Sequence, residues 1–355
     1  MPTPVTTASP SQSTIRFGLV GAGSIAAVHA RAIANTAGAQ LTACFSRSPA
    51  GAQAFAAEFG CDAVLSLAEL LARDDCDVIV ITTPSGSHAE IGIQAAHQKK
   101  HVLCEKPLDI SLDAIDRLIT ACESNGVLLG VVSQSRFGPG ALALKHAIDQ
   151  GRFGRLAQCS AYVPWLRTDE YYAAAPWRGT VADDGGALLN QGLHAVDLLL
   201  WLAGDVRTVS AKVQTRIHDI ETEDNAVAWL EFDNGGLGVI QCSTCCYPGE
   251  SKRIEVKGQY GSVTLVDDVP VLWEFATATP DDDEIVHLRE DAVVGLGASD
   301  PKAVAEGGHR AQYQDFVAAV AEGRPPAVTG TEARRSVQLI RAIYASSESG
   351  ETVRL

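Results

Sequence analysis

The sequence predicts an α/β protein with a doubly wound parallel sheet, followed by an α+β domain with a large, mostly antiparallel and open-faced sheet. Strand-like runs alternate with helical runs up to residue 136, a glycine-rich turn follows the first strand, and later strands alternate polar with apolar residues. A chain of 355 residues also exceeds what one hydrophobic core usually serves. We therefore expect a disordered leader over 1–14, a first domain over 15–136 and a second over 137–355.

Charge and composition exclude several classes of partner. The 28 basic and 43 acidic residues give a net charge of −15, and such a surface repels phosphate backbones and anionic bilayers. No apolar run is long enough to span a membrane, and the Thr/Ser/Pro-rich start lacks the basic and apolar blocks of a signal peptide. We expect neither nucleic acid nor a membrane as a partner.

The nine cysteines are scattered and mostly flanked by apolar residues. Cys242 and Cys245 have the spacing of metal ligands, but they lie in a strand-like run, and no second pair or nearby histidine completes a tetrahedral site. We therefore predict no metal. An odd number of apolar-flanked thiols fits a reducing compartment, so the expected location is cytoplasmic.

A glycine-rich turn follows the first strand. The strand 15–20 leads at once into 21–26 (GAGSIA) and then into an alanine-rich helical run through Thr36. Glycines let the chain approach a pyrophosphate closely, and the N-terminus of the helix supplies amide donors and a favourable dipole. In this strand–turn–helix context the pattern predicts a dinucleotide-binding Rossmann domain, with the cofactor at Gly21, Gly23, Ser24 and Ile25.

The end of the second strand bears on which dinucleotide is bound. A carboxylate about 20 residues past the glycines would bind the ribose 2′-hydroxyl of NAD. Here the strand 41–45 is followed by Ser46, Arg47 and Ser48, whose guanidinium and hydroxyls suit a 2′-phosphate. We favour NADP on this ground, and NAD is acceptable if Arg47 only stacks on the adenine.

The next long strand ends in polar residues at the expected ligand-binding edge of the sheet. The β-branched run 78–83 is followed by Pro84 and, after a short turn, by His88. Because open α/β sheets bind ligands at the carboxyl ends of their strands, Thr83 and Pro84 are predicted at the cofactor. His88 has two interpretations: it reaches the cofactor, or it only caps the helix 89–98.

The following strand, 102–104, runs directly into Glu105, Lys106 and Pro107. A lysine that is desolvated and near another positive charge can exchange a proton near neutrality, because both effects lower its pKa. Glu105 and Lys106 are therefore candidates for the cofactor site, and Lys106 also for the substrate. The alternative is an ordinary solvated pair that ends a strand.

The second domain contains strand-like runs in which polar and apolar residues alternate. A hairpin signal (DNGG) lies at 233–236, and the runs cover 156–164, 206–217, 225–232, 237–246, 253–256, 262–266 and 271–276. This pattern predicts an antiparallel sheet with one face covered and one face available.

A helix predicted over 187–203 carries a polar stripe. Asn190, His194 and Asp197 lie at i, i+4 and i+7, while apolar residues fill the neighbouring faces. A single satisfied core histidine is the default, but buried polar side chains must be hydrogen-bonded or take part in chemistry. The glycine pair 185–186 permits close approach of a ligand and favours a site. Asp197 either orients His194 or ties the helix to a neighbouring segment.

Aromatic and basic residues before that helix suit a ligand of the size of a sugar. Indole and phenol rings pack on the apolar faces of pyranoses, and a guanidinium donates to hydroxyl or cofactor oxygens. The alternative is that these side chains, Tyr171 and Tyr172 in particular, only anchor their own loop. The candidates for substrate contact are Trp165, Tyr172, Trp177 and Arg178.

In their order and spacing, these motifs resemble those of one family. It is named after glucose-fructose oxidoreductase, inositol dehydrogenase and the rhizopine catabolism protein (Gfo/Idh/MocA). The similarity runs from about Ile15 to the C-terminus. It rests on the glycine turn, Thr83-Pro84 with His88, Glu105-Lys106-Pro107, and the glycine pair 185–186 followed by 192–197 (GLHAVD).

The resemblance implies several roles. It gives His194 a catalytic role beside Lys106 and places His309 at the pocket. It also implies that the open face of the sheet forms a wall of the substrate cleft and the interface of a homo-oligomer, either a dimer or a tetramer. For His309, a helix-start residue without a ligand is the alternative. Many inositol-dehydrogenase-like members have aspartate at position 190, whereas this chain has Asn190. An amide cannot exchange a proton, so Asn190 is expected to orient the substrate.

The hypothesis from the sequence is an NAD(P)-dependent dehydrogenase that oxidises a hydroxyl of a sugar, polyol or sugar derivative, or reduces the ketone. Lys106 would accept the hydroxyl proton, with His194 hydrogen-bonded to the same oxygen. Two alternatives stay open. Some relatives cleave glycosides by transient oxidation with a tightly bound nucleotide, and others are non-catalytic, cofactor-sensing regulators.

Overall fold

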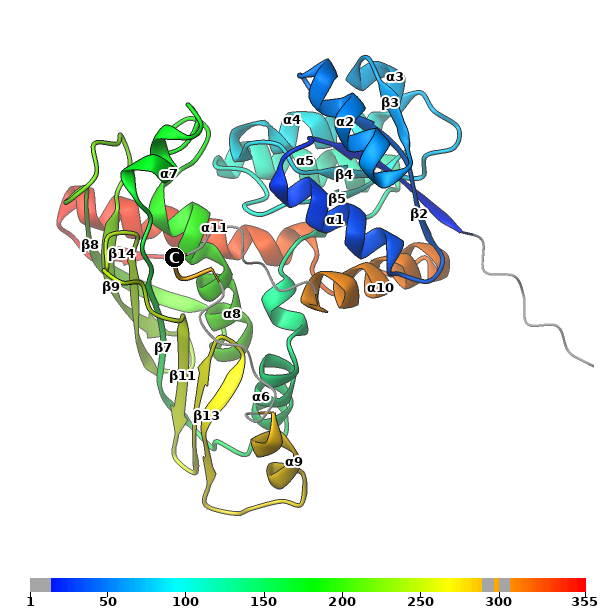
Figure 1. Cartoon of the computed structure of the whole chain (residues 1–355). Helices are drawn as coiled ribbons and strands as arrows, with labels where there is room; N and C mark the ends of the chain where they lie inside the picture. The colour runs from blue at the N-terminus through cyan, green and yellow to red at the C-terminus, as the bar shows by residue number, and fades with distance from the viewer. Residues whose placement is uncertain (1–13, 289–296, 300–306) are drawn as a thin grey trace, which may run out of the picture.

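The structure, a computed structural model, describes residues 14–288, 297–299 and 307–355 and contains two sheets with their helices (Figure 1). The predicted leader falls on residues that, up to 13, lie outside the described part. Within the described ranges, no helix is long and apolar enough to cross a membrane. All nine cysteines are free thiols, and the cytoplasmic location stays a prediction.

The first sheet has six parallel strands in the order β3-β2-β1-β4-β5-β6. The strands are β1 (Ile15–Val20), β2 (Ala39–Phe45), β3 (Asp62–Val64), β4 (Val78–Ile81), β5 (His101–Cys104) and β6 (Leu129–Val131). The helices between them are α1 (Ser24–Ala34), α2 (Pro49–Phe59), α3 (Leu67–Leu71), α4 (His88–His97) and α5 (Leu112–Asn125). The strand order reverses between β1 and β4, and such a switch point is where open α/β sheets bind ligands.

The second sheet has eight strands in the order β13-β12-β11-β7-β10-β9-β8-β14 and is antiparallel except between β7 and β10. Its strands are β7 (Leu156–Pro164), β8 (Val206–Gln214), β9 (Asn225–Phe232), β10 (Leu237–Ser243), β11 (Arg253–Gly258), β12 (Gly261–Val266), β13 (Val269–Phe275) and β14 (Val353–Arg354). The predicted hairpin at 233–236 joins β9 to β10. The predicted fold class is confirmed.

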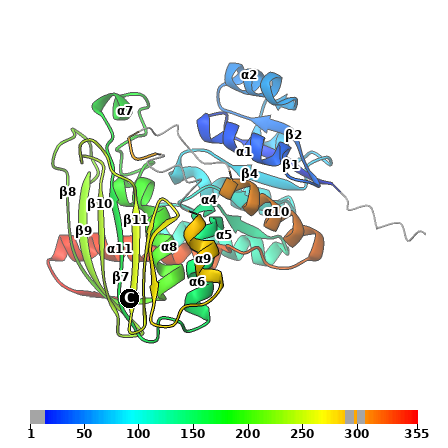
Figure 2. The same cartoon turned by 60° about the horizontal axis from the view of Figure 1, so that its bottom comes forward.

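One face of the second sheet is covered by helices. They are α6 (Pro139–Asp149), α8 (Leu193–Ala203) and α11 (Gly330–Ser349), which lie on the same side of the sheet (Figures 1 and 2). Alternate residues of β9 are buried, whereas Val227 and Trp229 between them are 49% and 48% exposed. Leu237 on the adjacent β10 is 52% exposed. A row of large apolar side chains on an uncovered face is typical of an interaction surface.

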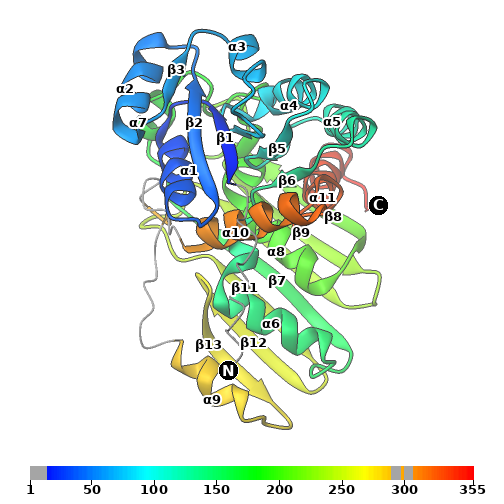
Figure 3. The ribbon, with the colours of Figure 1, turned by 90° about the vertical axis from the view of Figure 1, so that its right-hand side faces the viewer.

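A helix near the C-terminal end of the chain packs against the first sheet. Helix α10 (Gly307–Glu322) packs on α1 and β1 (Figure 3). Its Tyr313 and Phe316 belong to the same apolar core as Phe17. Two further short helices among the described residues are α7 (Asp169–Ala173) and α9 (Asp281–His287). The first core therefore includes residues from far beyond 136, and the predicted domain boundary stays a prediction.

Candidate active site

A cavity of 1160 Å³ is lined by both parts of the chain. The first part contributes the glycine turn and the ends of β2, β4 and β5. The second part contributes Trp165, Trp177, Asn190 and His194 among others. Sites for one small ligand reach about 1000 Å³, so this cavity has room for a dinucleotide and part of a second ligand.

The glycine turn presents an open helix terminus to this cavity. Gly21 has φ +117°, and a Cβ there would lie 2.5 Å from Thr82 Oγ1, so the position requires glycine. Gly23 precedes α1, no side chain caps the first amides of the helix, and a Cβ at Gly23 would meet no protein atom within 4 Å. These amides, with Ser24 and Ile25, line a space that suits a pyrophosphate.

The ends of β2 and β4 place some, but not all, of the predicted cofactor residues at the cavity. Ser46, Arg47, Thr83 and Pro84 line it, whereas Ser48 does not. The Ser48 hydroxyl instead accepts a hydrogen bond of 3.1 Å from the amide of residue 51 and caps α2. One of the two hydroxyls on which the NADP preference rested is therefore already used.

His88 is not at the cavity, contrary to the prediction that it reaches the cofactor. The side chain is buried, with Nδ1 2.8 Å from the carbonyl oxygen of Pro107 and Nε2 2.7 Å from that of Thr83. His88 starts α4 and ties the loop after β4 to the loop after β5. Its role is to hold these two loops together.

Lys106 follows β5 and reaches across to the second part of the chain. Its ammonium donates a hydrogen bond of 2.7 Å to the carbonyl oxygen of Asn190. Burial lowers the pKa of Lys106, and the charge of Arg167 adds to this, while Glu105 and Asp184 oppose it. The alternative of a solvated pair ending a strand does not describe this environment.

His194 lines the same cavity from α8. Burial, and then the charges of Lys106 and Lys252, lower the pKa of His194 well below its usual range, so the imidazole is neutral at pH 7. Its Nε2 lies 3.4 Å from Gln134 Nε2, and its Nδ1 is buried with no hydrogen-bond partner among the described residues. Such an atom at a cavity wall can bind a ligand hydroxyl.

The segment that carries Asn190 is a π-turn. The helix predicted over 187–203 contains this turn at Leu188–Gly192, near its start, and continues as α8. Glu223 Oε1 accepts a hydrogen bond of 2.8 Å from the first amide of the turn, and a Cβ at Gly186 would overlap Glu223 Oε2. Single π-turns inside helices are frequent at functional sites.

Asp197 forms a buried ion pair with Arg136. Its two oxygens accept hydrogen bonds of 2.8 and 2.7 Å from the guanidinium. This pair ties α8 to the segment 134–137 that follows β6. Of the two predicted roles, Asp197 therefore has the structural one.

The aromatic and basic candidates also divide into residues at the cavity and residues away from it. Trp165, Trp177, Arg178 and His309 line the cavity, but Tyr172 does not. Its hydroxyl lies 2.8 Å from Thr244 Oγ1 and its ring packs on His218, so the predicted substrate contact is corrected to a loop anchor. Tyr171 lines the cavity instead, with the Arg178 guanidinium 4.0 Å from the centre of its ring.

Sequence reasoning missed several polar residues of the cavity wall. They include Gln134, Arg167, Gln191 and Lys252. Arg167 is buried and donates to the Gln191 side chain and to the carbonyls of 166, 297 and 298. Lys252 donates a hydrogen bond of 2.9 Å to Ser135. No local pattern marks these cations, because their neighbours come from distant segments.

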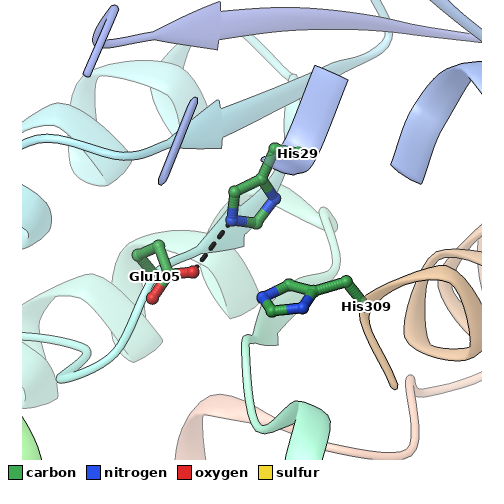
Figure 4. A group of neighbouring side chains, drawn as sticks. All are labelled: His29, Glu105 and His309. Atoms are coloured by element: carbon green, nitrogen blue, oxygen red, sulfur yellow. Dashed lines mark hydrogen bonds and ion pairs between the residues drawn. The ribbon is translucent and has the colours of Figure 1, made fainter. Parts of the chain in front are cut away.

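His29, Glu105 and His309 offer ligand atoms within 4.8 Å of one another (Figure 4). Two of them are already joined by a hydrogen bond of 2.8 Å between His29 Nε2 and Glu105, and His29 Nδ1 lies 2.7 Å from the Tyr313 hydroxyl. Although burial opposes it, the hydrogen bond from His29 holds the pKa of Glu105 at about 2. This chain of hydrogen bonds engages two of the three members, His29 and Glu105, and the absence of a metal stays a prediction.

Family models match both parts of the chain. An oxidoreductase-family model described as an NAD-binding Rossmann fold matches 15–133, and a Gfo/Idh/MocA C-terminal domain matches 141–264. Inositol 2-dehydrogenase of Rhizobium meliloti is 31% identical over 269 residues, 74% of this chain and 79% of that protein. The chain belongs to the Gfo/Idh/MocA family. It is thus related to NAD-binding oxidoreductases, and the predicted resemblance is confirmed.

Two solved structures are similar over nearly the whole length. One is the WlbA dehydrogenase from Bordetella pertussis in complex with NADH and UDP-GlcNAcA, with a TM-score of 0.90 and 36% identity over 98% of this chain and 99% of that one. The other is the WlbA enzyme from Chromobacterium violaceum with the same two ligands, with a TM-score of 0.88 and 32% identity over 98% and 97%.

Proposed function

We propose that this protein is an NAD-dependent dehydrogenase that oxidises a hydroxyl of an acidic nucleotide sugar of the UDP-GlcNAcA type. The observation that carries the proposal is that Lys106 and His194 line one cavity together with the open N-terminus of α1. The two similar WlbA structures, each holding NADH and UDP-GlcNAcA, support the choice of ligands.

The protein's part in the reaction is alignment and proton handling. Bound NAD would supply the acceptor for a hydride from the carbinol carbon. Lys106 takes the hydroxyl proton, because burial lowers its pKa and makes the neutral amine accessible. His194 is neutral and hydrogen-bonds to the same hydroxyl oxygen, which fixes the alcohol while its C–H and O–H bonds break.

The residues of the first domain fit NAD, which we propose in place of the NADP favoured from the sequence. The uncapped amides of α1 and the open side of Gly23 suit the pyrophosphate. At the end of β2, Arg47 and Ser46 face the cavity, and the Ser48 hydroxyl caps a helix. Arg47 can stack on adenine, so the reduced set of phosphate donors leaves no strong reason for NADP.

Cations around the second half of the cavity support an anionic substrate. Arg167, Arg178 and Lys252 line the cavity, where Lys252 lies beside two carboxylates that also line it, Asp267 and Asp268. Arg178 Nε is buried with no hydrogen-bond partner among the described residues. Guanidinium groups bind carboxylate and phosphate oxygens with two parallel hydrogen bonds, which suits a sugar acid linked to a diphosphate.

The substrate assay tests the proposal directly. With NAD and UDP-GlcNAcA the enzyme should produce reduced nicotinamide, and kcat/KM should exceed that for UDP-GlcNAc, which lacks the sugar carboxylate, about tenfold or more, the value of one charge-assisted hydrogen bond. Inositols serve as comparison substrates, and NADP serves as the comparison cofactor. Higher kcat/KM with a neutral polyol would contradict the acidic substrate, and release of a free sugar without reduced cofactor would revive the glycoside-cleaving alternative.

Arg178→Gln is expected to raise KM for UDP-GlcNAcA about tenfold with a smaller change in kcat, because the guanidinium binds ground state and transition state alike. Steady-state kinetics measure this split. The matched control is Arg155→Gln, an exposed arginine away from the cavity. If KM for the acid does not change while the protein stays folded, the anionic group binds elsewhere.

The uncovered face of the second sheet is the proposed interface of a homo-oligomer. Val227, Trp229 and Leu237 form its apolar row. Burial of this row against a second copy would remove apolar surface from water. Whether the assembly is a dimer or a tetramer stays a prediction for sedimentation analysis.

A further inference from the structure

Two carboxylates act on the ammonium of Lys106, those of Glu105 and Asp184. Glu105 has both of its oxygens engaged elsewhere. Oε1 lies 2.8 Å from His29 Nε2, and Oε2 accepts a hydrogen bond of 2.9 Å from the backbone amide of Lys106. Glu105 is therefore committed to the first domain, which makes Asp184 the acid that approaches from the second.

Asp184 is joined to Lys106 through one residue. It is 3% exposed, and its Oδ2 accepts a hydrogen bond of 2.7 Å from the amide of Gly179. Its Oδ1 accepts from the side-chain amide of Asn190, whose backbone carbonyl accepts the hydrogen bond of 2.7 Å from the Lys106 ammonium. Carboxylate, amide and ammonium thus form one chain that leads from a buried acid to the cavity wall.

We propose that Asp184 is a positioning residue for Lys106: its carboxylate supplies the counter-charge of the buried ammonium and, by holding the Asn190 side chain, fixes the carbonyl that orients Lys106. This inference rests on the proposed function for its catalytic meaning. It also gives Asn190 a role, which is to connect the acid to the base. The expected contact of the Asn190 amide with substrate is not needed for that role.

The charges act in both directions. The charge of Asp184 raises the pKa of Lys106 against its burial, and the charge of Lys106 lowers the pKa of Asp184, which burial raises overall. Other charged or titratable groups surround the pair. Glu105, Arg167 and His194 interact with Lys106, and those that interact with Asp184 are Tyr171, Tyr172, Arg178 and Glu223.

Asp184→Asn removes the charge and keeps the shape. The new amide can still accept from Gly179, and Asn190 can turn its own amide to present an oxygen. Without the counter-charge, Lys106 loses its proton more readily. The acidic limb of kcat/KM for alcohol oxidation should therefore move about one pH unit lower, the scale of one nearby charge.

The decisive measurement is competitive chemical labelling of Lys106 against pH, read by mass spectrometry, in wild type, Asp184→Asn and Asp183→Asn. Asp183 is the adjacent carboxylate, and its charge is not among those that act on Lys106. We expect the labelling curve to move to lower pH in Asp184→Asn only, with the kinetic limb following it. Coincident curves for all three proteins, or an equal shift with Asp183→Asn, would overturn the inference.

A second measurement does not depend on the folding of Asp184→Asn. In Lys106→Met, the Asp184 carboxyl, followed by carbon NMR of labelled aspartate, should titrate at higher pH than in wild type, because the neighbouring positive charge is gone. An unchanged titration would overturn the inference. Labelling requires no turnover, so the two proposals can be separated. A shift of the Lys106 labelling curve in a protein without dehydrogenase activity would reject the proposed function alone. Normal activity without such a shift would reject only the proposed role of Asp184.

Discussion

Lys106→Met is expected to lower kcat by about 10²-fold or more, because the variant keeps a side chain of similar length but has no group that can accept the hydroxyl proton. NADH affinity should change little, since the glycine turn and the α1 terminus are untouched. Rapid-mixing kinetics and NADH titration measure the two effects separately.

The pH dependence supplies a second test of the same residue. Burial lowers the pKa of Lys106, so the neutral amine that accepts a proton appears at lower pH than for an exposed lysine. Oxidation should rise with pH through this value in wild type, and this limb should vanish in Lys106→Met. Lys145→Met, at an exposed i,i+4 ion pair, is the control. Wild-type turnover in Lys106→Met would end the proposed proton transfer.

Gly21→Ala is expected to destabilise the protein and to abolish nucleotide binding. The backbone at Gly21 has φ +117°, and the new Cβ would lie 2.5 Å from Thr82 Oγ1 and 2.8 Å from the Thr82 carbonyl oxygen. Overpacking of this kind together with the unfavourable backbone should lower Tm by about 5 °C or more. A thermal melt and an NADH titration measure these losses.

Gly23→Ala is the matched variant with a different expected result. Its φ is −87°, and the added Cβ meets no protein atom within 4 Å, so Tm should stay at the wild-type value. The methyl group would occupy the space where the pyrophosphate approaches, and the NADH Kd should rise about tenfold or more. Unchanged NADH affinity in this folded variant would contradict the placement of the dinucleotide.

Local patterns were enough to predict the fold class and to mark Lys106 and His194 as candidates, and the family resemblance implied that the two lie together. The apolar run Val78–Ile81 is wholly buried, as a parallel strand covered on both faces must be. Gly21 and Gly23 stand where a strand meets a helix, and both are at the cavity. Lys106 was found because it ends a strand, and His194 because it lies on a polar stripe of an apolar helix. These features depend on periodicity and on edges of sheets.

The rest of the site could not be predicted from local patterns, because it depends on contacts between segments that are distant in the sequence. His88 and Tyr172 have the right chemistry for a ligand, but carbonyl oxygens and a threonine hydroxyl take up their polar atoms. Lys252 lies at the cavity without a motif, because β11 is placed there by sheet pairing. The π-turn at Leu188–Gly192 depends on Glu223, which follows it by more than thirty residues. No pattern within a short window contains such information.

The most direct test of the central claim is a crystal structure of the protein with NADH and UDP-GlcNAcA. The expected result is that Lys106 Nζ and a ring nitrogen of His194 both lie within hydrogen-bond distance of one sugar hydroxyl oxygen, on the carbon that faces the nicotinamide. A complex in which these two nitrogens contact different atoms, or in which the sugar lies outside the shared cavity, would contradict it.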